Sequence, residues 1–131
     1  AHVMHDSTRL REEFQHTNTG GTLQLARAAA AAGVGRFVFM STIKVNGEAT
    51  RDRPFRPDDE PQAIDPYGRS KRDAEAGLRQ LLPGQAVVIR PPLVHGPGAR
   101  GNLARLCRLA QLGAPVPFGS IHNRRDIVGV D

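Results

Sequence analysis

Arg36-Phe37-Val38-Phe39-Met40-Ser41-Thr42 is the stretch of the sequence that decides the fold. Its continuous apolar run, rich in aromatic and branched side chains, is typical of a strand buried on both faces of a parallel sheet. Two hydroxyl residues follow directly. Because active-site groups are normally presented at the carboxyl ends of parallel strands, Ser41 and Thr42 are candidates to face a ligand.

Two helices and a second strand are predicted around this run. Residues 8–32 carry apolar residues near helical spacing and predict one long helix or two in tandem. A further helix is predicted from about Pro66 to Leu82, because Pro is favoured at a helix start. Residues 86–90 predict a second buried strand. Helix, strand, helix and strand in alternation predict an α/β fold with a doubly wound parallel sheet.

The remaining segments are loops and shorter elements. Residues 47–66 are polar, rich in Pro and Arg and without a period, which predicts a long loop of a kind that is often functional. Residues 91–101 predict turns, 102–112 a helix and 126–131 the start of a strand. No shift in composition divides the chain, so residues 1–131 are expected to belong to one domain.

The composition, with 39% hydrophobic and 24% charged residues, is that of an ordinary globular protein. Cys107 cannot form an intrachain disulfide, and no apolar run is long enough to span a bilayer. These features favour a reducing, cytoplasmic setting and no membrane partner. His2 and His5 have no third ligand at a convincing spacing, so no metal site is expected.

A net charge of +5 raises the alternative of a basic domain that binds nucleic acid with a steep salt dependence. The arginines are spread along the whole chain, however, with acidic counterparts at Glu12-Glu13 and Asp58-Asp59-Glu60. Aromatic residues that could stack on bases are few. Nucleic acid is therefore not expected as a partner.

Tyr67 and Lys71 are spaced so that, on a helix, both side chains leave the same face one turn apart. A phenol with a pKa of about 10 is a poor base at neutral pH, but a nearby ammonium stabilises the phenolate and lowers that pKa. The phenol can then exchange a proton with a substrate hydroxyl. Such pairs also occur in helices where the tyrosine packs and the lysine is solvated. Ser41-Thr42 after a strand favours the catalytic interpretation.

Several motifs occur in an order that resembles a known family. They are Asn18-x-x-Gly21-Thr22, Arg36 to Thr42, Val45-Asn46-Gly47, Asp65-Pro66-Tyr67-Gly68-Arg69-Ser70-Lys71 and Arg90-Pro91-Pro92-Leu93-Val94-His95-Gly96-Pro97-Gly98. Together they resemble the extended short-chain dehydrogenases/reductases, in the NAD-dependent sugar-nucleotide epimerase/dehydratase branch. The spacing between Thr42 and Tyr67 is similar to that of UDP-glucose (UDP-galactose) 4-epimerases. The resemblance covers nearly the whole chain and implies a Rossmann-like fold.

The resemblance implies a role for each matching residue. Thr42 would hydrogen-bond the reacting oxygen, Tyr67 would be the acid/base, and Lys71 would both activate the tyrosine and bind the nicotinamide ribose. The residues implied at the cofactor, which would be NAD with NADP not excluded, are Met40, Ser41, Tyr67, Lys71, Pro91 and Leu93. The residues implied at the nucleotide-sugar substrate are Asn102, Val116, Phe118 and Arg125. The substrate-binding region would start from about residue 99, and a homodimer is possible in this family.

Two departures from the family pattern limit the chemistry. Sugar-nucleotide dehydratases usually carry Asp-Glu after the threonine, and this chain has Ile43-Lys44 there, which disfavours loss of water. No glycine-rich loop after a strand occurs in the sequence, so the pyrophosphate of the cofactor lacks its usual helix N-terminus. We therefore expect a partial domain, the central and catalytic part, without the N-terminal Gly-rich βαβ unit and inactive by itself.

The function implied by the resemblance is that of an NAD(P)-dependent enzyme acting at C4 of a nucleotide-linked sugar. A UDP-hexose or UDP-N-acetylhexosamine 4-epimerase fits best. Two alternatives stay open. One is a UDP-sugar 4-dehydrogenase or 4-ketoreductase, and the other is a non-catalytic nucleotide-sensing member of the fold, against which the presence of Thr42, Tyr67 and Lys71 argues.

Overall fold

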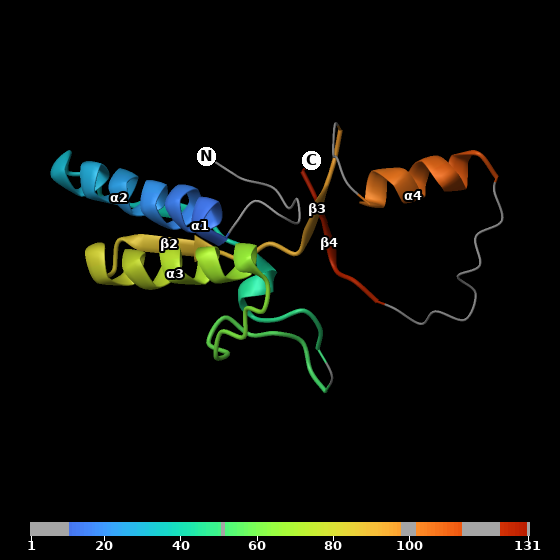
Figure 1. Cartoon of the computed structure of the whole chain (residues 1–131), viewed down its shortest axis with the longest axis horizontal. Helices are drawn as coiled ribbons and strands as arrows, with labels where there is room; N and C mark the ends of the chain where they lie inside the picture. The colour runs from blue at the N-terminus through green and yellow to red at the C-terminus, as the bar shows by residue number, and fades with distance from the viewer. Residues whose placement is uncertain (1–10, 51, 98–101, 114–123, 131) are drawn as a thin grey trace. The chain divides into compact units, whose positions relative to one another are not determined.

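Two parallel strands and the helix between them organise the first of two units, Ala1–Arg90, in the computed structural model. The structure describes residues 11–50, 52–97, 102–113 and 124–130. In this unit β1 (Phe37–Met40) pairs in parallel with β2 (Ala86–Ile89). Parallel neighbours require a crossover, which here contains helix α3 (Pro66–Leu81; Figure 1). The predicted alternation of helices and parallel strands is confirmed.

The N-terminal helical region consists of three successive segments. α1 (Arg11–Phe14) and α2 (Gly21–Ala31) are α-helical, and a π-helical segment, η1 (Gln15–Gly20), lies between them. The sequence predicted a helix over 8–32, and residues 8–10 lie outside the described residues. The π-helical turns are not visible in the hydrophobic pattern, because a wider turn changes the hydrogen-bond partners without changing which residues are apolar.

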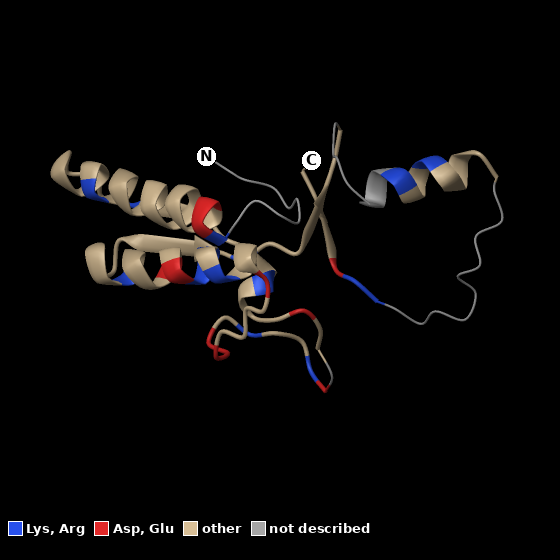
Figure 2. Cartoon of the chain, viewed as in Figure 1, with Lys and Arg blue, Asp and Glu red and all other residues tan. Residues whose placement is uncertain are grey.

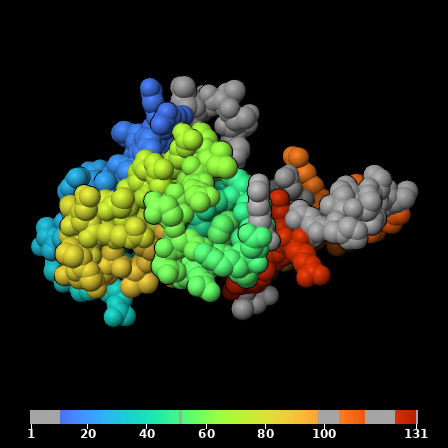
Figure 3. Space-filling view, turned by 90° about the horizontal axis from the view of Figure 1, so that it is seen from below, coloured from blue at the N-terminus to red at the C-terminus, as the bar shows by residue number. Residues whose placement is uncertain are grey.

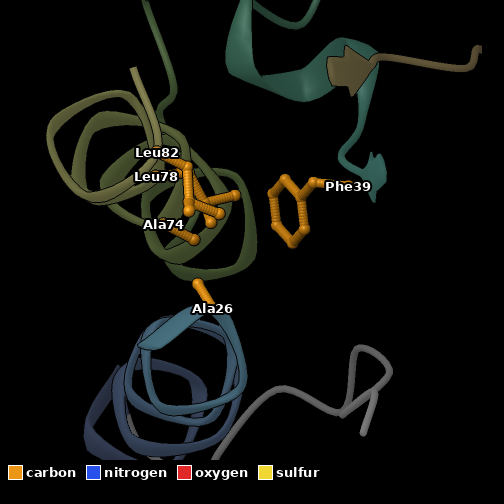
Figure 4. Packing of buried hydrophobic residues seen from close by; sticks show 5 residues of the cluster. All are labelled: Ala26, Phe39, Ala74, Leu78 and Leu82. Carbon is orange, nitrogen blue, oxygen red and sulfur yellow. The ribbon is translucent and has the colours of Figure 1, made fainter. Parts of the chain in front are cut away.

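The hydrophobic core of this unit lies between the two long helices and the sheet. Its buried members are Ala26, Phe39, Ala74, Leu78 and Leu82. The side chain of Phe39 points from β1 toward α3, and Ala26 of α2 points toward Ala74 (Figure 4). Small alanines on both helices allow α2 and α3 to lie side by side over one face of the strands.

The opposite face of the two strands differs from the expectation. The sequence predicted burial on both faces, but side chains on one face are exposed, among them Val38 at 55% and Met40 at 53%. On β2, Val87 and Ile89 are exposed in the same way. The reason is geometric, because successive side chains of a strand point to opposite faces and α2 and α3 cover only one. The prediction of double burial is therefore wrong for the described residues.

A long loop connects β1 to α3, as predicted. It begins after a short 3-10 turn, η2 (Ile43–Val45), which the sequence did not predict. The loop carries charges of both signs (Figure 2), and Arg53 pairs with Asp59 at 2.5 Å. Figure 3 shows the loop, in green, beside the first turns of α3. The Arg69 side chain donates to the carbonyl of Ala63 at 3.4 Å, which links the two segments.

In the second unit, Pro91–Asp131, the described residues form a pair of strands and a helix. β3 (Leu93–His95) pairs in parallel with β4 (Ile127–Gly129), and α4 spans Asn102–Gln111. The helix and the final strand were predicted. The prediction of turns throughout 91–101 is wrong at Leu93–His95, because these residues form β3 by pairing with a segment distant in the sequence. Within the described residues, no helix combines the length and apolar character needed to cross a membrane.

Leu78 provides a test of the core. It is 0% exposed, so Leu78→Ala should lower the free energy of unfolding by about 2–5 kcal/mol through lost burial and a residual cavity. Leu81→Ala on the same helix removes the same atoms from a side chain that is 36% exposed and should cost clearly less. Urea denaturation of the protein measures both. Equal losses would show that the core is not where the structure places it.

Candidate functional site

The start of α3 is fixed by a capping carboxylate and an ion pair. Asp65 is the N-cap residue and accepts a hydrogen bond from the backbone N–H of Gly68 at 2.6 Å. Pro66 follows at the first helical position, where its missing N–H is not needed. The ammonium of Lys44, just after β1, contacts the same carboxylate. These contacts place Tyr67 on the first turn of α3, next to the end of β1.

Four of the predicted residues line one open cleft of about 470 Å³. They are Met40, Ser41, Tyr67 and Lys71. The rest of the lining comes from α2 and β1, namely Thr22, Leu25, Phe37, Val38 and Phe39. The cleft therefore combines an apolar wall with a phenol and an ammonium at the carboxyl end of β1.

Thr42 follows Ser41 directly but is not part of the cleft lining. Its hydroxyl accepts from the backbone N–H of Lys44 at 3.4 Å and caps the η2 turn. Ser41 reaches the cleft, while its hydroxyl donates to the buried carboxylate of Glu75 at 2.5 Å. The two adjacent hydroxyls thus have different partners.

Lys71 is nearly buried, with 7% of its surface exposed. Its Nζ donates to the carbonyl of Met40 at 2.9 Å and lies 4.6 Å from the centre of the Phe39 ring. Burial lowers the pKa of Lys71 because it penalises the charged form, and the carboxylate of Glu75 acts in the opposite direction. Contacts with β1 therefore hold the ammonium in position, and the carboxylate of Glu75 on the same helix stabilises its charge.

Tyr67 is partly buried and packs edge-on against Phe14 of α1, with the ring centres 6.0 Å apart. Burial raises the pKa of the phenol, the charge of Asp65 raises it further, and the ammonium of Lys44 lowers it. The net direction is upward, opposite to that expected from the sequence, because burial disfavours the phenolate. Burial therefore favours the protonated form of the phenol.

A buried polar network that the sequence did not predict is attached to the cleft through Ser41. Glu75 is 1% exposed and receives the hydroxyl of Ser41 and the guanidinium of Arg90, whose Nη2 lies 2.6 Å from Oε2. Arg90 also donates to Oδ1 of Asn46 at 3.1 Å. A signal was present, because Glu75 lies four residues after Lys71 and next to Ala74 on the apolar face of the predicted helix. A charged residue on that face requires a buried partner.

The other predicted site residues lie in the second unit or outside the described residues. Pro91 begins that unit, Leu93 begins β3, Asn102 begins α4, and Arg125 is an exposed residue shortly before β4. Val116 and Phe118 lie outside the described residues. The roles assigned to these six residues stay predictions, as do those assigned to Thr42 and to the four predicted residues of the cleft.

Comparison with known proteins identifies the family. The family model described as "NAD dependent epimerase/dehydratase family" matches residues 1–131. The chain belongs to that family. A UDP-glucose 4-epimerase of Vibrio cholerae is 44% identical over the full length of this chain, which spans 42% of that relative. The chain therefore corresponds to less than half of such an epimerase.

Solved structures of the epimerase/dehydratase family agree with the fold. A UDP-glucose 4-epimerase of Thermotoga maritima, crystallised with UDP-glucose, matches with a TM-score of 0.77 and 29% identity over 94% of this chain and 43% of that chain. The Bordetella bronchiseptica enzyme WbmG, in complex with NAD and UDP, matches with a TM-score of 0.77 and 25% identity over 99% of this chain and 41% of that chain. The fold is thus part of a Rossmann-like α/β fold, as predicted.

The ion pair at the start of α3 makes stability depend on pH. Burial alone would raise the pKa of Asp65, but the Gly68 N–H and the Lys44 ammonium lower it below the ordinary 3.8. A carboxyl group with a lowered pKa stabilises the fold above its unfolded pKa, and that stability is lost as the pH falls through the folded pKa. Asp65→Asn keeps a capping side chain and removes the charge.

We expect Asp65→Asn to be less stable than the unsubstituted protein at neutral pH. The difference should shrink as the pH falls below 3.8 and Asp65 itself becomes protonated. Urea denaturation of both proteins over a pH series measures this. A difference that stays constant through that range would assign the loss to capping geometry alone.

Proposed function

We propose that the complete protein is a nucleotide-sugar 4-epimerase that acts on a UDP-hexose or UDP-N-acetylhexosamine through Thr42, Tyr67 and Lys71. The observation that carries this proposal is the meeting of Tyr67 and Lys71 in one cleft at the carboxyl end of β1. Membership of the epimerase/dehydratase family and the 44% identity to a UDP-glucose 4-epimerase support it.

The cleft has the chemistry that the nicotinamide half of NAD requires. Its wall is formed by apolar side chains such as Met40 and Val38, against which a flat ring can pack, and Lys71 supplies hydrogen-bond donors for ribose hydroxyls. We expect Met40, Ser41, Tyr67 and Lys71 to hold this half. When bound, the nicotinamide supplies a hydride acceptor that can also return the hydride.

The chain's own residues would manage the proton and the orientation of the sugar. Tyr67 would exchange a proton between its phenolic oxygen and the C4 hydroxyl oxygen. Thr42 would turn its hydroxyl from the η2 turn toward that oxygen. The ammonium of Lys71 lies one helical turn after Tyr67, where its positive charge favours the phenolate whenever Tyr67 gives up its proton. The Phe14 ring of α1 packs against the Tyr67 ring and covers one side of it.

Lys44 argues against dehydration of the sugar by this site. At the position where the dehydratase pattern has a glutamate, this chain has an ammonium that contacts Asp65 and lies 3.4 Å from Glu48. An ammonium paired in this way does not supply the carboxylate chemistry that water loss requires. Epimerisation therefore remains the preferred activity, with 4-dehydrogenation or 4-keto reduction as the alternative that uses the same residues.

An assay of the complete protein with UDP-hexoses and UDP-N-acetylhexosamines tests the proposal. Following both the sugar products and the nicotinamide absorbance separates the outcomes. Formation of the C4 epimer without net absorbance change supports the epimerase, and a stoichiometric absorbance change supports the dehydrogenase or reductase. If no UDP-sugar is converted or bound, the nucleotide-sensing alternative takes its place. The cytoplasmic setting, the homodimer and the absence of nucleic acid as a partner stay predictions.

The role of Tyr67 can be tested directly in the complete protein. Tyr67→Phe keeps the ring that packs on Phe14 and removes only the hydroxyl, so the fold should be unaffected. Turnover should fall by about 10²–10⁴-fold, the usual contribution of a positioned acid/base, while NAD affinity stays nearly unchanged. Steady-state kinetics and NAD titration measure these two quantities. Turnover close to that of the unsubstituted protein would remove Tyr67 from the chemistry.

A further inference from the structure

The buried carboxylate of Glu75 connects α3 to residues that directly follow β1 and β2. Ser41, at the end of β1, donates its hydroxyl to Oε1 at 2.5 Å. Arg90, at the end of β2, donates Nε to Oε1 at 3.0 Å and Nη2 to Oε2 at 2.6 Å. Glu75 itself belongs to α3, the helix of Tyr67 and Lys71. One side chain thus connects both strand ends to the catalytic helix.

The loop that follows the site is attached to the same network. Nη1 of Arg90 donates to Oδ1 of Asn46 at 3.1 Å and to the carbonyl of Pro57 at 3.4 Å. The side chain of Asn46 in turn donates to the carbonyl of Arg56 at 3.0 Å. The guanidinium therefore fixes both the start of the long loop and a point near its middle.

The network is more than a surface ion pair. Glu75 is 1% exposed, and the side chain of Arg90 is 10% exposed. Buried charges are costly unless paired with good geometry, and a bidentate guanidinium provides that geometry. Arg79 also contacts this carboxylate, with Nη2 3.4 Å from Oε2 of Glu75. The Arg79 side chain is 59% exposed, so this ion pair is weaker than that with Arg90.

We propose that Glu75, together with Arg90, is a positioning residue of the active site, which holds the Ser41–Thr42 backbone and the Lys71 ammonium in the arrangement that catalysis needs. The proposal rests on the proposed function. Glu75 acts on Ser41 through a direct hydrogen bond and on Lys71 through charge, one helical turn along α3.

The effect of Glu75 on Lys71 can be measured without any sugar substrate. Its Nζ faces the Met40 carbonyl and the Phe39 ring of β1, which carry no charge, and on α3 it has Tyr67 one turn before and Glu75 one turn after. The charge of Arg90, which directly follows β2, is paired with Glu75. Removing the carboxylate charge leaves Lys71 without its stabilising anion, so its pKa should fall.

The experiment compares Glu75→Gln with Arg79→Gln in the complete protein. We expect Glu75→Gln to lower kcat by at least about tenfold, with a smaller change in KM, because small displacements of reacting groups are costly. The pKa of Lys71, followed by NMR with labelled lysine and assigned with Lys71→Arg, should fall in Glu75→Gln. Arg79→Gln removes a guanidinium from the same carboxylate and should leave kcat and that pKa unchanged.

A folded Glu75→Gln protein with kcat within about threefold of the unsubstituted protein, or with an unmoved Lys71 pKa, would overturn the proposal. If Glu75→Gln does not fold, Glu75→Asp replaces it, since it keeps the charge with a shorter reach. We then expect a similar loss of kcat with Lys71 titrating as before, and retention of full kcat would overturn the role. An unsubstituted protein that converts no UDP-sugar would contradict the proposed function, while the Lys71 titration still tests the link to Glu75.

Discussion

A carboxylate placed almost entirely out of water constrains the first unit of this protein. Burial of Glu75 is costly unless donors surround its carboxylate, and the closest donors come from Ser41 and Arg90, directly after the two parallel strands. Because Arg90 also contacts Asn46 and the loop, the requirement to pair one charge fixes four segments of the chain together. The geometry of the cleft depends on this network, because Ser41 belongs to both.

The electrostatics of the cleft follow from the balance between burial and pairing. Burial disfavours the charged form of both Tyr67 and Lys71, which raises the pKa of the first and lowers that of the second. Paired groups oppose each effect, Lys44 at the phenol and Glu75 at the ammonium. The protonation of Tyr67 and of Lys71 therefore depends on charged neighbours that do not themselves line the cleft. Under the proposed function, this arrangement would exchange a proton with a sugar hydroxyl.

The sequence predicted the parts of the fold that depend on local rules. Pro66 at the start of α3 and the apolar runs of β1 and β2 are local signals, and each element was found within one or two residues of its predicted bounds. β3 was missed because its strand forms only by pairing with residues 127–129. The exposed side chains of Val38 and Met40 were predicted as buried, because a hydrophobic run does not tell which segment covers it.

The candidate site, like the fold, was predicted where it depends on local spacing and missed where it depends on tertiary contacts. The sequence by itself determined that Tyr67 and Lys71 share a helix face and that Ser41-Thr42 follows a strand, since both depend on spacing along the chain. Only the tertiary structure decided that Ser41, Tyr67 and Lys71 line one cleft and that Thr42 does not. It also decided that Ser41 turns its hydroxyl to Glu75 and that Lys44 acts on Tyr67. The physical reason is that pairing of buried polar groups depends on distances between segments far apart in sequence, which spacing along the chain does not specify.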